Sequence, residues 1–592
     1  MMLRALYDLA QRQGLVDDPD YQLVGVDIFV RINEDGRLLS LETTGEKVGR
    51  GKPVRVPRIP ERAGKVARPG FLVDKSAYVL GVEPEGKDDD FAARCFAGFC
   101  EQIDRAAEAT NDTGLRAVSR FLAAWPGQRE QALAKYPFDE KGSWTGSEYI
   151  AFRIDPEDAL VHERPAVRAY WAGQRAAQNL AGQRSMCLVT SRMAVPERLH
   201  AKIKRIPSPK PQAGGALLVS FNKPAFESHG LSQGDNAPVC RDAVVGYVTA
   251  LNWLLERTPN RRHRYGVPIG DDAVLVFWTR KDSQVSDWLT ALLPDGPDAK
   301  SEQHAMSRIV DEVESVPWKG RAPDSDEDEN NPFYAVTLSE HTRVIVRDWF
   351  ETTAAQVRRS LRQFLTDLRL GHSPIELPLP LLLSSLDTKA GKPPADLMRH
   401  LLRSAFHGDP LPRQLLLAAL ARLRLPADRN ESLLLYRRCA LIKAALLRSP
   451  LTRKWEVSVS LDESNRSVPY LLGRLFAVLE QLQEAAQGSS LNTTIRDRFF
   501  GAASTTPGLV FPRLLKLSVH HAAKAEGLGR ALERTKASIV AGLPASALPR
   551  LLSPEEQGLF AIGYYHQRDK RYEKRSESPA AETPLTGSLA AV

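Results

Sequence analysis

The chain has 592 residues, of which 43% are hydrophobic; this composition is typical of a soluble globular protein, and the length suggests three or four domains. Its 80 Lys and Arg residues outnumber its 72 Asp and Glu residues, which leaves a formal net charge of +8. This modest basic excess favours a nucleic acid or another anionic partner, although a mildly basic soluble protein without such a partner has the same composition.

Cysteine usage and hydropathy indicate the compartment. The five cysteines are scattered, with no Cys-x-x-Cys pair and no Cys/His set, so we expect no metal site, no cofactor and a reducing environment. The N-terminus lacks the basic and apolar regions of a signal peptide, and the apolar tract at 377–386 is short and interrupted by prolines. We therefore expect a soluble, cytoplasmic protein.

The N-terminal residues predict a short amphipathic helix at 2–13, a strand at 21–33 and a second strand, LLSLETT, that completes a hairpin. Residues 45–70 come next and are rich in Lys and Arg, with prolines and glycines that exclude a long helix. We interpret them as a basic extended loop that contacts a DNA backbone or groove; a solvated linker is the alternative. Its candidate DNA-binding residues are Lys52, Arg55, Arg58, Arg62, Lys65 and Arg68.

Residues 88–184 are predicted to be mainly helical. Strand-like pieces at 186–190 and 216–221 then flank a second basic loop, which contains Lys204 and Arg205. This loop is a weaker candidate for DNA contact, because a surface loop with four basic groups is common.

The segment 220–236, SFNKPAFESHGLSQGDN, gathers amide and hydroxyl side chains beside two aromatic rings. An amide offers both a donor and an acceptor to a base edge, so we predict that this polar loop reads bases. The alternative is that its polar side chains pin the loop through backbone hydrogen bonds. The candidate base-reading residues are Asn222, Lys223, Gln233 and Asn236.

The middle of the chain predicts a helix at 243–256, strands within 333–350 and a helix at 356–370, and prolines and glycines place a linker at 376–395. The acidic run at 324–329 and the pair Asp271–Asp272 lack an organised ligand spacing. A solvated connector and a turn are therefore the better interpretations of these carboxylates.

From 396 to 575 the composition shifts to Leu, Ala and Arg at helical spacings, which predicts a helical bundle, and residues 576–592 are expected to be disordered. The fold class is thus α+β: a mixed α/β, DNA-engaging region at 1–375 followed by an all-α C-terminal domain. Basic residues of the bundle are candidates for a stripe that tracks a nucleic-acid strand, with ordinary surface charge as the alternative. They are Arg474, Arg496, Arg498, Arg513, Lys516 and Arg534.

The common catalytic motifs are missing from the sequence, which contains no GxxxxGK[ST] phosphate loop, no HExxH and no GxSxG. We therefore predict a binding protein and not an enzyme. Two alternatives remain: an autonomous metal-dependent nuclease that uses Asp271, Asp272 and the acidic run, or a nonspecific scaffold that binds single-stranded nucleic acid.

Several blocks that run in order along the chain resemble the large subunit of the type I-C CRISPR Cascade, the Csd family. The polar loop with its following helix and strand carries the resemblance most strongly. The other blocks are MLRALYDLAQ from Met2, FLVDKSAYVLG at 71–81, NPFYAVTLSEHTRVIVRDWF at 331–350, YLLGRLFAVLEQLQ at 470–483, LNTTIRDRFFGAASTTPGLVFPRLLKL at 491–517 and GLFAIGYYHQRDKRY at 558–572.

This resemblance implies a subunit of a crRNA-guided surveillance complex that recognises the protospacer-adjacent motif in double-stranded DNA, aids duplex opening and holds the displaced single strand. It also implies contacts with crRNA-bound backbone subunits, recruitment of a helicase–nuclease, and a small subunit that arises by internal translation and corresponds to the bundle. Lys75 stands where the family more usually has asparagine, so we expect it to contact a phosphate or a purine acceptor.

Overall fold

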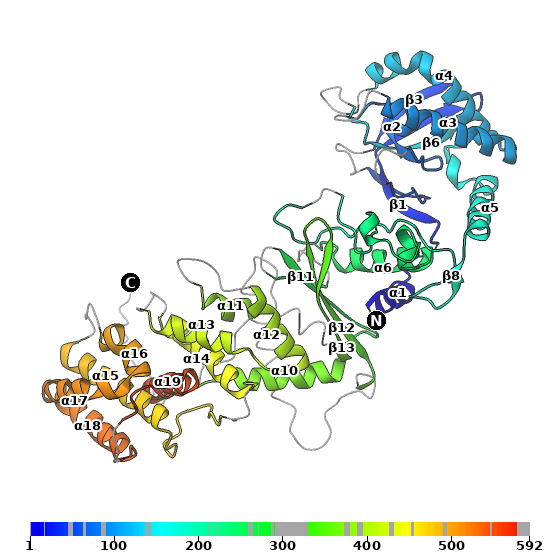
Figure 1. Ribbon diagram of the computed structural model, residues 1–592. Helices are drawn as coiled ribbons and strands as arrows, with labels where there is room; N and C mark the ends of the chain where they lie inside the picture. The colour runs from blue at the N-terminus through cyan, green and yellow to red at the C-terminus, as the bar shows by residue number, and fades with distance from the viewer. Residues whose placement is uncertain are drawn as a thin grey trace, which may run out of the picture. The chain divides into compact units, whose positions relative to one another are not determined.

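The computed structural model describes residues 2–16, 18–44, 51–62, 67–84, 90–136, 138, 144–211, 214–221, 223–258, 265–269, 272–283, 285, 289, 329–371, 379–387, 395–425, 431–450, 455–488, 494–544 and 548–576. The chain forms two compact units, whose elements are labelled in Figure 1. Unit 1 comprises Met1–Ile206, Lys210–Leu255 and Glu340–Ile345, and unit 2 comprises Pro207–Pro209, Glu256–Ser339 and Val346–Val592.

Unit 1 is built on a mixed sheet with the strand order β3-β2-β6-β5, and β7 pairs with β6. β2 runs parallel to β6, whereas β3 and β5 each pair antiparallel with their neighbours. A parallel pair needs a long crossover connection, which here contains α3 and α4. The bounds are β2 (Ile28–Asn33), β3 (Leu38–Thr43), β5 (Asp74–Lys75), β6 (Tyr149–Asp155), β7 (Ala159–Leu160), α3 (Phe91–Thr110) and α4 (Thr113–Lys135).

The core of unit 1 lies between this sheet and the helices α3 and α4. The rings of Phe99 and Phe121 pack on Phe152 of β6, with centroids 6.5 and 5.9 Å away. The fully buried Trp125 donates its indole N–H to the carbonyl oxygen of Leu80 over 2.9 Å, so its polar atom is satisfied inside the core. The prediction that 88–184 is mainly helical was therefore wrong at 149–160, where β6 and β7 form part of the sheet.

A two-stranded antiparallel ribbon, β1 (Tyr21–Val26) and β4 (Lys52–Pro57), packs beside β6. The predicted single strand at 21–33 is two strands, because the backbone turns at the buried Asp27. The Asp27 carboxylate accepts hydrogen bonds from the backbone N–H groups of Tyr149 at 2.8 Å and Gly51 at 3.2 Å. The predicted basic loop is likewise corrected: it contains the strand β4, in which the buried Val54 and Val56 stand on either side of the exposed Arg55.

The remaining helices of unit 1 are α1 (Met2–Arg12), α2 (Ser76–Val79), α5 (Pro165–Ala181) and α6 (Arg241–Leu254). The blue α1 packs against the green α6 (Figure 1). This approach is close, because a Cβ atom at Gly246 would lie only 2.7 Å from the ring of Tyr7. In the described part of 182–240, the expected strands shrink to β8 (Ser185–Met186), β9 (Met193–Ala194) and isolated bridges, one of which joins Ile203 to Ala216.

Unit 2 contains a four-stranded sheet in the order β10-β11-β12-β13, and its strands share a core with α10 and α12. Phe333 of β12 packs against Phe350 of β13 and Phe406 of α12. The strands predicted within 333–350 and the helix predicted at 356–370 are confirmed. The bounds are β10 (Gly266–Ile269), β11 (Ala273–Thr279), β12 (Pro332–Glu340), β13 (Val344–Thr353), α10 (Ala354–Leu368) and α12 (Ala395–His407).

The predicted C-terminal helices are confirmed, but the predicted linker at 376–395 is not. α11 (Leu379–Ser384) lies inside that range, and its buried leucines belong to the same core as Phe277 of β11. Sheet and bundle therefore form one unit.

The other helices of the bundle are α13 (Arg413–Leu423), α14 (Glu431–Leu447), α15 (Val468–Gln487), α16 (Ile495–Thr505), α17 (Pro507–Lys524), α18 (Glu526–Ala541) and α19 (Pro554–Ser576). The expected disordered tail lies outside the described residues from 577 onward.

α15 is the central helix of the bundle and is buried on all sides over most of its length. Two glycines bring it against α19. A Cβ atom at Gly473 would lie 2.0 Å from the carbonyl oxygen of Phe560, and one at Gly563 would lie 2.2 Å from that of Tyr470. This backbone-to-backbone crossing fixes how the side chains of α15 and α19 meet, and thereby positions the cleft described below.

Candidate nucleic-acid interface

The outer face of the β1–β4 ribbon carries exposed cationic and apolar side chains. Arg55 pairs in register with Leu23, which is 76% exposed, and the Arg55 guanidinium lies 5.5 Å from the ring centroid of Tyr21. Arg168 lies 5.8 Å from the same ring. His162 supports the ribbon from within by donating Nε2–H to the carbonyl oxygen of Arg55 at 3.0 Å; burial lowers the pKa of His162 to about 4, so it is neutral at pH 7. A two-stranded ribbon of this kind fits the DNA major groove.

Arg58, in contrast, turns inward. Its Nε donates to the carbonyl oxygen of Pro19 at 2.7 Å, and its Nη2 donates to that of Tyr21 at 2.8 Å. Burial lowers the pKa of Arg58, and the negative charge of Asp20 opposes that effect. The side chain therefore ties the end of β4 to the segment that precedes β1.

Arg62 is also occupied within the protein. Its guanidinium pairs with the fully buried carboxylate of Asp74 and lies 3.9 Å from the ring centroid of Tyr78, and its Nε donates to the carbonyl oxygen of Arg68 at 2.9 Å. Desolvation raises the pKa of Asp74, whereas Arg62 and the backbone N–H of Gly70 oppose the rise. Arg62 thus neutralises a buried charge and clamps the chain that leads into β5.

The other candidates of the basic segment are placed differently. Lys52 is exposed at the start of β4, and Arg68 is half-buried. Lys75 is half-buried in β5, opposite Tyr149 of β6. Lys65 lies outside the described residues. Within this segment, Arg55 and Lys52 are the described cations that project from the ribbon.

The second basic loop is held by Asn252 of α6. The Asn252 side chain accepts from the backbone N–H of Lys204 at 2.7 Å and donates to the carbonyl oxygen of Lys202 at 3.2 Å. Arg205 has a φ of +67°, in the left-handed region that costs energy for a residue with a side chain. Lys204 and Arg205 are both exposed, so the loop presents their charges to solvent.

Charge and close packing bring three remote segments together in unit 1. Desolvation raises the pKa of Glu61, and the positive charges of Lys204 and Arg58 are among those that oppose the rise. Desolvation also raises the pKa of Glu197, and the positive charge of Arg58 is among those that oppose this rise. The polar loop joins this cluster at Gly234, where a Cβ atom would lie 2.4 Å from the carbonyl oxygen of Glu197. The ribbon end and the second basic loop therefore lie within electrostatic reach of one another, and the polar loop packs against the segment at Glu197.

Within the polar loop, Asn236 has a structural role. Its Nδ2 donates to the carbonyl oxygens of Leu231 and Gln233, both at 3.1 Å, and its Oδ1 accepts from the backbone N–H of Ser228 at 3.2 Å. For this residue the geometry favours the backbone-pinning alternative over base reading. Asn222 lies outside the described residues, and Lys223 is exposed.

Besides the exposed Lys223, Gln233 and Phe226 are side chains of the loop that have capacity left for a ligand. Gln233 has a φ of +45°, and its Oε1 is buried with no hydrogen-bond partner in the described part of the chain. The ring of Phe226 is 42% exposed and lies 4.8 Å from the guanidinium of Arg343, which donates to the carbonyl oxygen of Ser220 at 3.2 Å. The loop thus presents an aromatic ring backed by a fixed cation.

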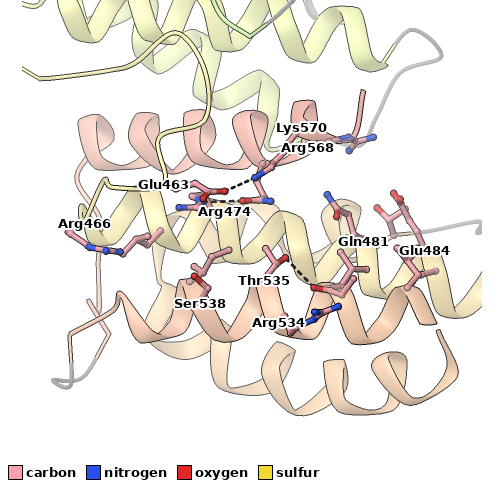
Figure 2. A pocket seen from close by; sticks show the side chains of 18 of the residues that line it. Glu463, Arg466, Arg474, Gln481, Glu484, Arg534, Thr535, Ser538, Arg568 and Lys570 are labelled. Atoms are coloured by element: carbon pink, nitrogen blue, oxygen red, sulfur yellow. Dashed lines mark hydrogen bonds and ion pairs between the residues drawn. The ribbon is translucent and has the colours of Figure 1, made fainter. Parts of the chain in front are cut away.

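A second candidate site is a cleft of about 1070 Å³ in the helical bundle, bordered by α15, α18 and α19 (Figure 2). Five cations line it against two carboxylates, those of Glu463 and Glu484, over an apolar floor that includes Leu532 and Ile539. Figure 2 shows the basic side chains on several sides of the cleft. The cations are Arg466, Arg474, Arg534, Arg568 and Lys570.

The polar groups of the cleft are fixed to different degrees. Arg474 is 5% exposed, and its Nε donates to Gln567 at 3.1 Å. Burial lowers the pKa of Arg474. Arg568 is held by the buried Glu480 at 3.3 Å, whereas the Nε2 of the buried Gln481 has no hydrogen-bond partner among the described residues. An unsatisfied buried donor beside a cationic cleft favours an anionic or oxygen-rich ligand.

The predicted basic stripe is corrected by these positions. Arg496 is buried beside the ring of Tyr564, 5.8 Å away, and Arg474 lines the cleft from α15, so neither belongs to an exposed helix surface. Arg474 on α15 and Arg496 on α16 are both buried, which helical spacing alone does not reveal. Arg498, Arg513 and Lys516 are exposed on α16 and α17, and Arg534 is exposed on α18 at the cleft.

In the described part of the chain, the carboxylates considered as metal ligands of a nuclease do not come together in one site. There, no group of three or more His, Cys, Asp or Glu residues is arranged to hold a metal ion. Asp272 is exposed and lies 3.7 Å from Arg347, and Glu329 pairs with Arg359 at 2.7 Å. Asp271 and residues 324–328 lie outside the described residues.

Comparison with known proteins identifies the family. No curated protein matches the sequence. The family model described as CRISPR-associated protein (Cas_Csd1) matches residues 3–572, nearly the whole chain.

The chain belongs to the Cas_Csd1 family. It is therefore a CRISPR-associated, Cascade-type protein, as the blocks in its sequence indicated. Across the residues that the structure describes, no helix is both long enough and apolar enough to span a membrane.

Sequence reasoning missed the residues that assemble the interface of this Cas_Csd1 protein. Asn252 lies in the apolar pattern of a helix, and its contact with the second basic loop is visible only in the fold. Glu197 and Tyr21 carried no signal because their partners are remote in the sequence. The sequence did point to Phe226, because an aromatic residue stands there within a polar tract. It gave no indication of Arg343, which lies against the Phe226 ring but comes from the turn between β12 and β13.

We predict that Arg62 stabilises the fold and does not bind DNA directly. Arg62→Ala leaves the buried Asp74 carboxylate unpaired and should lower the free energy of unfolding by about 3 kcal/mol. Chemical denaturation measures this loss, with Arg55→Ala as the exposed control that changes stability little. The double variant Arg62→Ala/Asp74→Asn should recover part of the loss. Unchanged stability of Arg62→Ala together with weakened DNA binding would contradict the assignment.

Proposed function

We propose that this protein is the large subunit of a type I-C, crRNA-guided Cascade that recognises the protospacer-adjacent motif in double-stranded DNA. It would also aid duplex opening, stabilise the R-loop and recruit the helicase–nuclease. The observation that carries the proposal is the proximity, in unit 1, of the ribbon, the second basic loop and the polar loop. In such a complex the guide RNA supplies the long sequence match, and the protein checks only a short motif.

Duplex binding rests on the exposed cations of unit 1. Arg55 and Lys52 project from the ribbon, and Lys204 and Arg205 project from the loop that Asn252 holds. Exposed cations can exchange their counterions for phosphates, whereas the guanidinium groups of Arg58 and Arg62 are hydrogen-bonded to backbone carbonyl oxygens. The phosphate contacts would position the duplex but carry no sequence information.

Motif recognition is assigned to the polar loop. The Oε1 atom of Gln233 is buried without a partner in the described structure, so the side chain would turn outward to pair its amide with the N6 and N7 atoms of adenine in the major groove. Lys223 is exposed on the same loop and offers donors to a guanine or a phosphate. Asn236 contributes indirectly, because it fixes the backbone from which Gln233 projects.

Duplex opening is assigned to Phe226. The ring is partly exposed and rests on the Arg343 guanidinium, so it can stack on a base without losing its support. Base–aromatic stacking is worth about 1–3 kcal/mol per base, comparable to the cost of unstacking one base step. A ring at this place beside the motif-reading loop would stabilise the first unpaired base.

Holding the displaced strand is assigned to the cleft in the bundle. Arg466 and Arg534 of the cleft would contact phosphates, Arg568 and Lys570 are already paired with Glu480 and Glu463, and the unsatisfied amide of Gln481 suits a base edge or a phosphate oxygen. The exposed residues Arg498, Arg513 and Lys516 on α16 and α17 would extend the same function. The bundle would be the counterpart of the separate small subunit, and the crRNA-bound backbone subunits are the partners that keep the complex together.

The chain itself is proposed to bind DNA and not to cut it. The strand-cleaving chemistry would belong to the helicase–nuclease that docks after target binding. A nuclease of its own would require an organised set of carboxylates for metal ions, and Asp272 is engaged with Arg347 at the surface.

The duplex-binding proposal predicts a loss of affinity with a changed salt dependence. The triple variant Arg55→Ala/Lys204→Ala/Arg205→Ala should bind target duplex more weakly in the assembled complex, and the slope of log K against log salt should become shallower by up to about 3. The matched control replaces three exposed arginines of α3 and α4, Arg94, Arg105 and Arg120, and keeps the same net charge as the triple variant. Equal losses in both variants would show that only net charge matters.

Motif reading predicts a loss of discrimination in the Gln233→Ala variant. Binding to the cognate motif should weaken by about 1–3 kcal/mol, whereas binding to mutated motifs should change little. A panel of motif variants at fixed salt measures this gap. Asn236→Ala is the informative comparison, because it should disturb the loop and weaken binding to all motifs together. A uniform loss in Gln233→Ala would assign a structural role to that residue too.

A further inference from the structure

Two cysteines of unit 1, Cys187 and Cys240, lie together and play no part in the proposed DNA contacts. Cys187 follows β8, and Cys240 caps the N-terminus of α6. The Cys187 Sγ accepts hydrogen bonds from the backbone N–H groups of Cys240 at 3.3 Å and Thr190 at 3.4 Å. One thiol therefore sits on N–H donors at the start of a helix, an environment that stabilises a thiolate.

The second thiol lies beside the first. The Cys240 backbone N–H is hydrogen-bonded to the Cys187 Sγ, and Thr190, whose own backbone N–H bonds the same sulfur, places its hydroxyl 3.7 Å from the Cys240 Sγ. Burial on its own raises the pKa of Cys187, but the hydrogen bonds from Cys240 and Thr190 outweigh it and bring the pKa to about 7. Burial raises the pKa of Cys240. Near pH 7 a large fraction of Cys187 is therefore thiolate, whereas Cys240 stays protonated.

The other three cysteines are different. Burial raises the pKa of Cys95 and Cys439, and it raises that of Cys100 to about 11. In the described part of the chain, none of these three forms a hydrogen bond with another thiol. A nucleophilic sulfur with a resolving thiol beside it is the arrangement of a redox-sensitive cysteine pair, and it occurs here at Cys187 and Cys240.

We propose that Cys187 and Cys240 are a dithiol that closes into an intramolecular disulfide when a peroxide reaches it. The Cys187 thiolate attacks one oxygen of hydrogen peroxide, the O–O bond breaks, and the departing hydroxide takes up the proton that Cys187 had released, giving water and a sulfenic acid. The Cys240 thiol then attacks the sulfenic sulfur. The S–S bond forms, the S–O bond breaks, and the leaving oxygen departs as a second water with the Cys240 proton. The two thiols lose two electrons and the peroxide gains them.

The position of the pair gives the disulfide a structural consequence. Residues 188–239 lie between the two cysteines and carry both the second basic loop and the polar loop. A disulfide would join the two ends of this segment, restrict its unfolded states and raise the stability of unit 1. The neighbouring side chains of Met186 and Leu188 are more than half exposed, so the dithiol lies directly beneath the surface.

The test is oxidation of the intact protein followed by peptide mapping. The protein is treated with hydrogen peroxide, free thiols are blocked, and tryptic peptides are analysed by mass spectrometry. We expect a disulfide between the peptides 185–192 and 206–241, which is lost on reduction, and a shift of a thermal unfolding transition to higher temperature. This test does not depend on DNA binding, so its outcome is separate from that of the proposed function.

The cysteine variants supply the controls. Cys100→Ser should keep the linked peptides, whereas Cys240→Ser should abolish them and let Cys187 proceed to higher oxidation states. If Cys240→Ser folds poorly, the peptide map of the protein without substitutions still shows whether the disulfide between Cys187 and Cys240 forms. The proposal is overturned if both thiols stay reduced at a peroxide concentration that oxidises the exposed Met186, or if Cys187 is oxidised without linking to Cys240.

Discussion

The charge cluster around Arg58 is the interaction on which the candidate interface of this Cas_Csd1 protein depends. Arg58 binds the carbonyl oxygens of Pro19 and Tyr21, and its charge acts on the carboxyls of Glu61 and Glu197. Arg58 therefore acts on the ribbon end and on the segment that leads to the second basic loop, and the polar loop packs on the latter. The positive charge of Arg58 favours the ionised forms of both carboxyls, and the exposed cations of the ribbon and of the second basic loop are available to phosphates.

In both units, some arginines form contacts inside the protein and others are exposed at its surface. A guanidinium has five N–H donors, so it can satisfy several carbonyl and carboxylate oxygens in the interior. Arg62 and Arg58 do this in unit 1, and Arg568 does it in the bundle, where it pairs with the buried Glu480. Basic residues of this family member therefore cannot be assigned to DNA by their number alone. Exposure distinguishes Arg55 from Arg58 and Arg62, which are half-buried and hydrogen-bonded to the backbone.

The α+β class and the C-terminal helices were predictable, because leucine spacing in the bundle is regular and long. β6 was missed, since a short buried strand between helices carries little periodic signal, and the predicted linker failed because its leucines are core residues. The basic and polar segments were found from composition. The roles of their residues could not be found in this way. Arg62 pairs with Asp74, and the second basic loop is hydrogen-bonded to Asn252, and both contacts join segments that are separate in the sequence. Contacts between residues that are remote in the sequence determine which basic side chains are engaged inside the protein and which are exposed to solvent.

The central claim is that the polar loop of unit 1 lies against the DNA motif. The most direct measurement places the photo-crosslinking residue p-benzoylphenylalanine at Phe226 and maps crosslinks to a target duplex in the assembled guide-RNA complex. The control position is Leu39, exposed on β3. The account predicts crosslinks from position 226 at the first base pairs beside the motif, and few from position 39. Equal crosslinking from both positions, or crosslinks from 226 far from the motif, would contradict it.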